Sequence, residues 1–254
     1  MKLRHLLLLS LITQANHPPV VKIISPASNT VAAAGSIRYE ISVTDKEDGD
    51  SRYDEINPKE VILEIRAGST PTTGSAPTTG STANTGPAPT TGGSPNTSTP
   101  PTTGQNDPLE SPGLAAMARS NCFNCHQFTG KGIGPSLFEI AKRPASADTL
   151  ARRIKDGSAG IWGKEKMPSH PELGGDDIRR MVQWIQKYAA TPGVTYQTGL
   201  TGVLQFPKPG PYTLTAAYTD HGENAHAANG TKADPPAANT QHLTGLDRVT
   251  LTIK

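Results

Sequence analysis

The sequence predicts a multidomain protein of mixed α and β structure, in which an all-α domain interrupts an antiparallel β-sandwich. Apolar residues recur at helical spacing only in the middle of the 254-residue chain. Apolar residues that alternate with polar ones occur on both sides of this region. Residues 69–106, which contain no charged side chain, separate the first alternating region from the helical one.

The first fifteen residues are typical of an export signal. A basic start (1–5) precedes a short apolar run (6–12) and small residues suited to a signal peptidase (13–15). The run is too short to span a bilayer, and no cysteine near it would take a lipid. We expect residues 1–15 to be removed and the protein to reach the bacterial periplasm, without a transmembrane anchor; a buried N-terminal helix is the alternative.

Residues 16–67 and 191–254 are predicted to be two halves of one β-sandwich. Period-two patterns at 20–24, 37–43 and 61–65 indicate strands in the first half, and those at 212–218 and 249–253 indicate strands in the second. Each half offers about three strands, too few to bury a core alone. Between them, residues 68–107 repeat Pro-Thr-Thr-Gly and lack apolar surface, which predicts an extended, disordered linker.

Residues 108–190 are predicted to form the helical domain. Ser111 followed by Pro112 is a helix start, Ser136 caps a second short helix, and a third covers about 148–154. Asp176 or Asp177 is expected to cap the last helix. Four apolar residues at helical spacing mark that helix: Ile178, Met181, Val182 and Ile185.

The segment from Cys122 to His126 reads Cys-x-x-Cys-His, the attachment signature of c-type haem. Two thiols three residues apart can add to the two vinyl groups of one haem, and His126 then lies beneath the iron as an axial ligand. The chain has 2 cysteines, Cys122 and Cys125, so neither a disulfide framework nor a cysteine-rich zinc site fits. Dithiol redox exchange and zinc binding remain the alternatives for the motif.

This region resembles the class I cytochrome c family in its bacterial form. The motifs that carry the resemblance follow in order: Cys122-x-x-Cys125-His126, Gly134-Pro135, Met167-Pro168 and a terminal helix with Trp184. The resemblance implies one covalent haem c, with Met167 as sixth iron ligand. It also implies that the Pro135 carbonyl accepts a hydrogen bond from His126. Gly113 matches the family's helix-contact glycine only approximately.

The residues also favour Met167 without the family. Of 4 methionines, Met1 leaves with the export signal, Met117 lies on the opening helix and Met181 lies in an apolar stripe. Met167 lies in a loop, and His170 is the rival ligand. Trp162 is expected either to donate a hydrogen bond to a haem propionate or to pack against the haem edge.

The two β halves resemble one PKD-type, immunoglobulin-like domain. The carrying segments are 18–21 with Ser42-Val43-Thr44-Asp45 in the first half and the run from Gly210 to Asp220 in the second. The resemblance implies a discontinuous sandwich with the cytochrome domain inserted. It extends loosely to cytochrome c and PKD-type fusions of Bacteroidetes-like bacteria, where such modules accompany sugar or alcohol dehydrogenases.

Two polar regions are candidate metal-binding sites. The acidic turn with Asp45, Glu47, Asp48, Asp50 and Asp54 is a candidate for Ca²⁺, although its spacing is not that of an EF-hand and a solvated turn is the preferred interpretation. The histidines at 221, 226 and 242 flank a polar loop, and we expect them to be solvated.

The predicted function is electron transfer by an exported mono-haem cytochrome c, not enzymatic catalysis. Ligation by both His126 and Met167 leaves the iron without an open position. A redox protein, such as a dehydrogenase or a terminal oxidase chain, is the expected partner. A net charge of +2 gives no nucleic-acid footprint, and the oligomeric state stays open. A peroxidase-like haem enzyme and a carbohydrate-binding or surface-binding β module are the alternatives.

Overall fold

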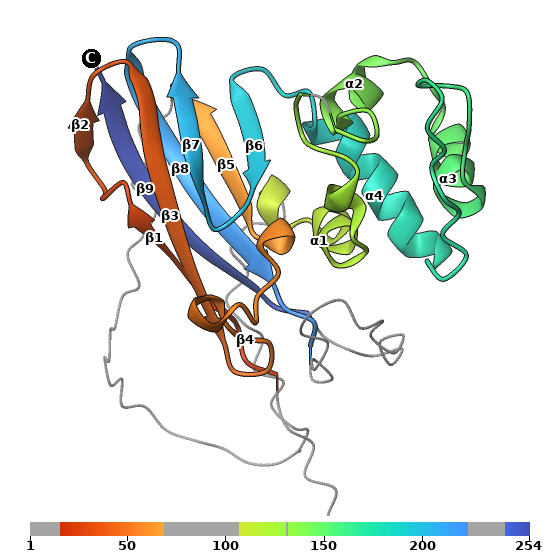
Figure 1. Ribbon diagram of the computed structural model, residues 1–254, viewed down its shortest axis with the longest axis horizontal. Coiled ribbons are helices and arrows are strands. Elements are labelled where there is room, and N and C mark those ends of the chain that lie inside the picture. Colours follow the sequence, from red (N-terminus) through yellow and green to blue (C-terminus); the bar gives the residue numbers. More distant parts are fainter. Residues whose placement is uncertain (1–15, 69–106, 131, 223–241) are drawn as a thin grey trace, which may run out of the picture.

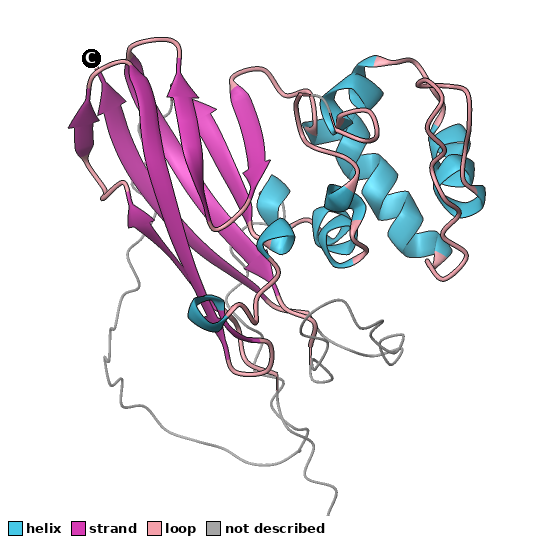
Figure 2. Ribbon diagram, viewed as in Figure 1, coloured by secondary structure: helices cyan, strands magenta, loops and turns pink. Residues whose placement is uncertain are grey.

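The computed structural model describes residues 16–68, 107–130, 132–222 and 242–254. The predicted export signal, almost all of the predicted linker and His226 lie outside these residues. The strands lie together on one side of the described molecule, and the α-helices lie together beside them (Figures 1 and 2).

The elements follow the predicted order of strands, helices and strands. The α-helices are α1 (Pro112–Arg119), α2 (Leu137–Lys142), α3 (Ala147–Asp156) and α4 (Gly175–Tyr188). The first set of strands is β1 (Val20–Ser25), β2 (Thr30–Ala32), β3 (Gly35–Asp45), β4 (Gly49–Asp50) and β5 (Ile62–Ala67). The second set is β6 (Val194–Thr198), β7 (Thr201–Phe206), β8 (Gly210–Thr219) and β9 (Thr244–Ile253). Short 3-10 helices cover Ser51–Tyr53, Pro58–Glu60, Pro108–Glu110 and Cys122–Asn124.

Strands from both sides of the helical region share both sheets. One sheet pairs β3 with β1, β4 and β7, and the other has the order β2-β9-β8-β5-β6. β3 therefore pairs with β7, and β5 lies between β6 and β8, all in antiparallel register. At the start of the intervening segment, the Ala67 N–H donates to the Gly193 carbonyl over 2.9 Å. Residues far apart in sequence thus meet at one place on the sheet.

The predicted strands are confirmed, and their inward residues form one core. Tyr39, Ile41 and Val43 of β3 are buried in the same cluster as Leu214 and Ala216 of β8. β2, β4, β6 and β7 were not predicted. β6 carries only the half-buried Val194 and the buried Tyr196, so its pattern is too short to show a period.

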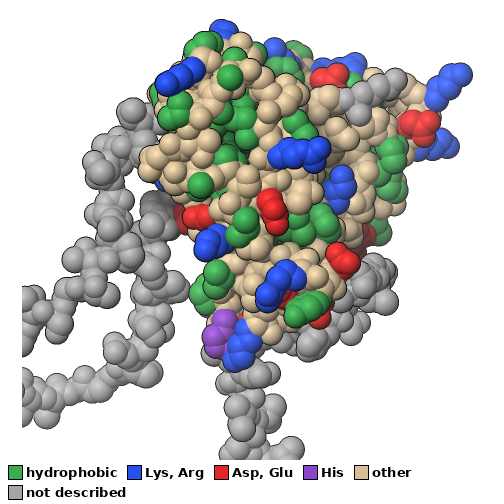
Figure 3. All heavy atoms as spheres, turned by 60° about the vertical axis from the view of Figure 1, so that its left-hand side comes forward, with side chains coloured by type: hydrophobic (Ala, Val, Ile, Leu, Met, Phe, Trp, Pro, Cys, Tyr) green, Lys and Arg blue, Asp and Glu red, His purple; other side chains and the backbone are tan. Residues whose placement is uncertain are grey.

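On the face shown in Figure 3, which brings the left side of Figure 1 forward, basic and acidic side chains are interspersed. Val20, Ile24 and Val31 of β1 and β2 are among the exposed apolar residues. Single exposed apolar residues of this kind are normal on a protein surface.

The helices begin largely as the sequence predicts. Ser111 precedes Pro112 at the start of α1, and Ser136 with Glu139 forms a reciprocal capping box on α2. The predicted cap of α4 is wrong. Gly174 is the N-cap residue, while Asp176 and Asp177 lie in the first turn, where their charge favours the positive end of the helix dipole.

α1 and α4 cross in close contact at Gly113. A Cβ atom built there would lie 2.5 Å from the Arg180 carbonyl carbon, closer still to its oxygen, and 3.0 Å from the Met181 nitrogen. Only glycine permits this backbone approach. The approximate family match at Gly113 is therefore a true helix contact.

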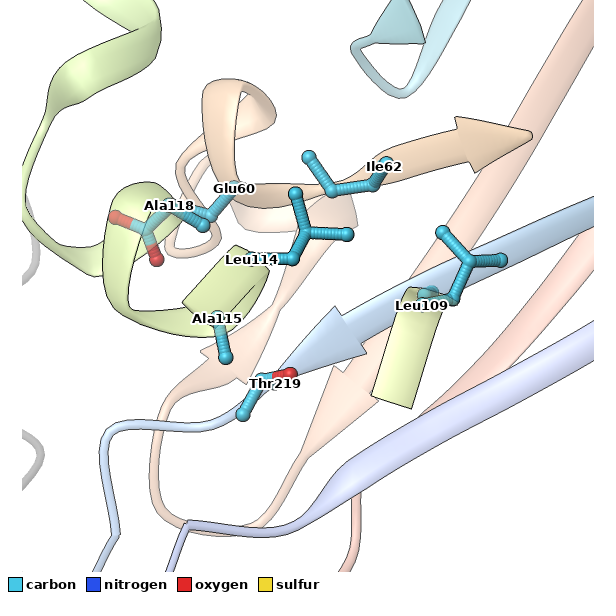
Figure 4. Close-up of a pocket in the computed structure, with 8 residues that line it drawn as sticks. Glu60, Ile62, Leu109, Leu114, Ala115, Ala118 and Thr219 are labelled. Atoms are coloured by element: carbon cyan, nitrogen blue, oxygen red, sulfur yellow. The ribbon is translucent and has the colours of Figure 1, made fainter. Parts of the chain in front are cut away.

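The helices rest on the outer face of the sheet that contains β5, β6 and β8. Ile62, Tyr196 and Ala217 of those strands belong to the same buried cluster as Leu114 and Trp184 of α1 and α4. A small cavity remains at this junction, where Leu114, Ala115 and Ala118 of α1 approach Ile62 and Thr219 (Figure 4). The helical region and the sheet thus share a core.

Candidate haem-binding site

The Cys-x-x-Cys-His motif lies in a tight turn directly after α1. Cys122 opens a 3-10 helix, and its carbonyl accepts hydrogen bonds from the backbone N–H groups of Cys125 (3.2 Å) and His126 (2.9 Å). Both cysteines are free and partly exposed. The turn therefore brings the two thiols and the imidazole into one short segment, as the sequence predicts.

The His126 ring is held by the backbone that follows it. Its Nδ1 atom lies 2.7 Å from the Pro135 carbonyl oxygen. Since a carbonyl can only accept, Nδ1 carries the proton and donates, which leaves the Nε2 lone pair available to a metal. A Cβ on Gly134 would lie 2.7 Å from the ring's Cε1 atom. Glycine at 134 thus lets backbone pack directly against the imidazole.

The segment that surrounds His126, residues 122–130 and 132–137, is called the haem-motif loop below. Backbone hydrogen bonds close it: Gly134 N–H donates to Cys125 O and Leu137 N–H to Gln127 O, both over 2.9 Å. Phe138 N–H donates to Phe128 O over 3.1 Å. The position of the imidazole therefore depends on the packing of the residues on both sides of it.

Met167 lies in a loop fixed against the end of α3. It exchanges two backbone hydrogen bonds with Ser158, of 2.9 and 3.1 Å. Gly157 ends α3 with φ of +79°, and a Cβ there would lie 2.7 Å from the Met167 carbonyl oxygen. Met167 is half-buried. In contrast, Met117 and Met181 are buried in the core between the helices, which agrees with the packing role predicted for Met181.

The rival ligand His170 is engaged by its neighbours. Its Nδ1 atom lies 3.0 Å from a carboxylate oxygen of Glu172, and its backbone N–H donates to Ile154 O over 3.2 Å. Trp162 is 41% exposed, and the Arg143 guanidinium stacks 4.7 Å from its ring centroid. Arg143 also donates to the carbonyl of Ile161, so it holds the loop that carries Trp162.

The thiol environment does not suit dithiol chemistry. Burial raises the pKa of Cys122 to about 12. Redox-exchange motifs instead lower the pKa of the attacking thiol, because the thiolate is the nucleophile. The direction of the shift at Cys122 is thus opposite to that of a dithiol redox motif.

His221 has a role that the sequence analysis missed. Its two ring nitrogens lie 3.1 Å from carboxylate oxygens of Asp48 and Glu60, and its side chain is 33% exposed. Burial alone would lower the pKa of His221, but the two carboxylates raise it to about 10. The prediction that His221 is solvated is wrong, because β8 ends beside the acidic turn, a pairing that no local pattern reveals.

Carboxylates of the acidic turn accept hydrogen bonds from backbone N–H groups of the same turn. Asp45 accepts from the N–H groups of Glu47 and Asp48, and Asp50 pairs with Arg52 over 2.6 Å. Within the described ranges, no group of three or more His, Cys, Asp or Glu residues is arranged to hold a metal ion. The calcium alternative thus gains no support from the arrangement of these carboxylates.

A Cys-x-x-Cys-His turn directly after α1, with a carbonyl-bonded histidine and a methionine loop, is the arrangement of a c-type haem domain. The family described as "Cytochrome C oxidase, cbb3-type, subunit III" matches residues 112–185. Cytochrome c-552 of Nitrosomonas europaea is 38% identical over 71 residues, 26% of this chain and 69% of that protein. Cytochrome c2 of Rubrivivax gelatinosus is 41% identical over 75 residues, 27% of this chain and 88% of its own length.

Cytochrome c-551 of Stutzerimonas stutzeri is 36% identical over 81 residues, 30% of this chain and 77% of that protein. The crystal structure of wild-type Nitrosomonas europaea cytochrome c552 aligns with 28% of this chain and 94% of its own, at 34% identity and a TM-score of 0.27. The chain belongs to the cytochrome c family through this segment, and its relatives there are electron-transfer proteins, not enzymes. In the part of the chain that the structure describes, no helix is long and apolar enough to cross a membrane.

Proposed function

We propose that the protein is an exported electron carrier that holds one covalent haem c in residues 108–190. The hydrogen bond from His126 Nδ1 to Pro135 O, 2.7 Å long, carries this proposal. It fixes the tautomer in which Nε2 can bind iron, and Gly134 leaves no side chain against the ring. Two free thiols, an imidazole nitrogen and a thioether form the donor set that covalent haem requires.

Each side chain of the site has a distinct task. Cys122 and Cys125 would hold the haem through thioether bonds, and His126 and Met167 would ligate its iron. Haem c supplies a one-electron couple between ferrous and ferric iron. With both side chains bound, the iron would have no open position for a substrate, which favours electron transfer over a peroxidase-like activity.

Met167 is the proposed sixth ligand. Met117 and Met181 are in the buried core, whereas Met167 lies in a loop whose backbone is fixed by Ser158 and Gly157. His170 stays the rival ligand, because its contact with Glu172 is made through Nδ1 and leaves Nε2 available. A thioether ligand gives a higher potential than a second histidine would. Trp162 would either donate a hydrogen bond to a haem propionate or pack against the haem edge.

The β region is proposed to be one discontinuous PKD-type sandwich that serves as a scaffold or docking module. The pairing of β5 with both β6 and β8 supports this, since neither flank could form that sheet alone. Termini that lie close together permit a domain insertion. The electron partner is proposed to be a periplasmic redox protein such as a dehydrogenase.

The proposal is tested by the mass of the polypeptide after denaturation and acid extraction. The wild-type chain should retain one haem, while Cys122→Ala or Cys125→Ala should reduce or abolish retention. A wild-type polypeptide without covalent haem would overturn the proposal. The peroxidase alternative predicts instead that the reduced protein binds carbon monoxide readily, which an iron ligated by His126 and Met167 should not do.

A further inference from the structure

A line of aromatic rings connects the β-sandwich to the haem-motif loop. Tyr196 of β6 lies 5.3 Å from the Phe128 ring centroid, and Phe128 lies 4.8 Å from Phe123. Tyr196 also makes an edge contact with Trp184 of α4, at 5.4 Å. All four rings are at most 4% exposed, so these are core contacts and not surface encounters.

Both phenylalanines belong to the segment that positions the haem ligands. Phe123 lies between Cys122 and Cys125, and Phe128 is two residues beyond His126. The carbonyl of Phe128 accepts from Phe138 N–H, which joins this side of the loop to the chain that follows Pro135. The Phe128 ring therefore packs beside the backbone that connects the two ends of the His126 to Pro135 hydrogen bond.

We infer that Tyr196, a residue of the sandwich, is a positioning residue for the haem ligand His126. Tyr196 lies outside residues 112–185, the range that the cytochrome family matches. The Tyr196 ring fills space against Phe128 and Trp184, and so presses the haem-motif loop into place from the sheet side. The β module thereby sets the surroundings of the iron as well as carrying the domain. This inference rests on the proposed haem function.

The aromatic ring of Tyr196, and not its hydroxyl group, positions the haem-motif loop. The contacts to Phe128 and Trp184 are made by the ring faces and edges. Removing the ring leaves a void beside the loop, and water that enters such a shell favours the more highly charged, oxidised iron. Tyr196→Ala should therefore shift the midpoint potential to more negative values, whereas Tyr196→Phe should keep the wild-type potential.

The experiment uses the full-length holoprotein. Redox titration gives the potential, and the hyperfine-shifted haem methyl resonances of the oxidised protein report the orientation of the axial imidazole. Leu204→Ala is the control, because Leu204 is 1% exposed and packs in the sandwich core away from the helices. It should lower the melting temperature without moving the potential or the methyl resonances.

The inference fails if Tyr196→Ala keeps the wild-type potential and methyl pattern, or if Leu204→Ala changes them as much. If Tyr196→Ala does not accumulate, Tyr196→Leu keeps part of the apolar volume but removes the ring contacts, and a smaller shift of the potential in the same negative direction is expected. A wild-type chain without covalent haem would overturn the proposed function itself. A normal wild-type haem with unchanged variants would overturn only the role of Tyr196.

Discussion

Replacing Gly113 with alanine should force α1 and α4 apart. The added Cβ would lie 2.5 Å from the Arg180 carbonyl carbon, and ordinary contact between carbon atoms is about 3.5 Å or more, so the helices must separate by about 1 Å. The opposing atoms are backbone, which no rotamer change can move. Overpacking of this kind costs about 3 kcal/mol, and the better helix propensity of alanine returns about 1 kcal/mol. The free energy of unfolding should therefore fall by about 2 kcal/mol.

Thermal unfolding followed by far-ultraviolet circular dichroism measures this loss. For a cooperative unit of this size, about 2 kcal/mol corresponds to a decrease of about 4–8 °C in melting temperature. Gly175→Ala is the matched control, since Gly175 is the first residue of α4 and a Cβ there meets nothing within 4 Å. It should be neutral or slightly stabilising. If Gly113→Ala melts at or above the wild-type temperature, the close-contact argument is wrong.

Three further predictions follow from the site and the sandwich. Met167→Ala should lower the midpoint potential and remove the red charge-transfer band of a thioether-to-iron bond, whereas His170→Ala should retain both. His221 should contribute about 2–3 kcal/mol, after allowance for screening of a side chain that is 33% exposed. Because carboxylates raise the pKa of His221 from 6.5 to about 10, that contribution is complete below pH 6.5 and is lost as the pH rises through 10. Replacing residues 68–192 by an Asn-Gly turn should give a soluble β protein with a cooperative unfolding transition. The same variant carries Ile62→Thr and Tyr196→Ser, which make polar the sheet face that the deletion exposes.

Each of these predictions has an outcome that contradicts it. Retention of the charge-transfer band in Met167→Ala would point to another methionine as the ligand, and a wild-type protein without the band would favour His170. For His221, urea unfolding of wild type and His221→Gln is compared across the pH range, and a stability difference that does not shrink between about pH 7 and 10 would contradict the linkage. For the sandwich, a folded 16–67 fragment would show that the first flank does not need the second.

The sequence determined the local chemistry of this protein. The spacing of Cys122, Cys125 and His126 within one turn defines haem attachment wherever the segment lies, because the three groups need only neighbouring residues to come together. The apolar stripe of α4 and the alternation in β3 and β8 likewise follow from periods of 3.6 and 2, which each segment shows by itself. Met167 is proposed as the ligand by elimination among few methionines, an argument that needs composition and not geometry.

Tertiary structure decided which faces meet. Tyr196 lies 68 residues beyond Phe128, and strand β6 has too few apolar residues to be recognised from the sequence. The contact of Tyr196 with the haem-motif loop was therefore not predictable. His221 reaches Asp48 and Glu60 only because the end of β8 lies beside the acidic turn. Local patterns predict that a residue is buried, but not which residue packs against it. That partner depends on how whole sheets and helices pack, which is determined by many contacts between residues distant in sequence.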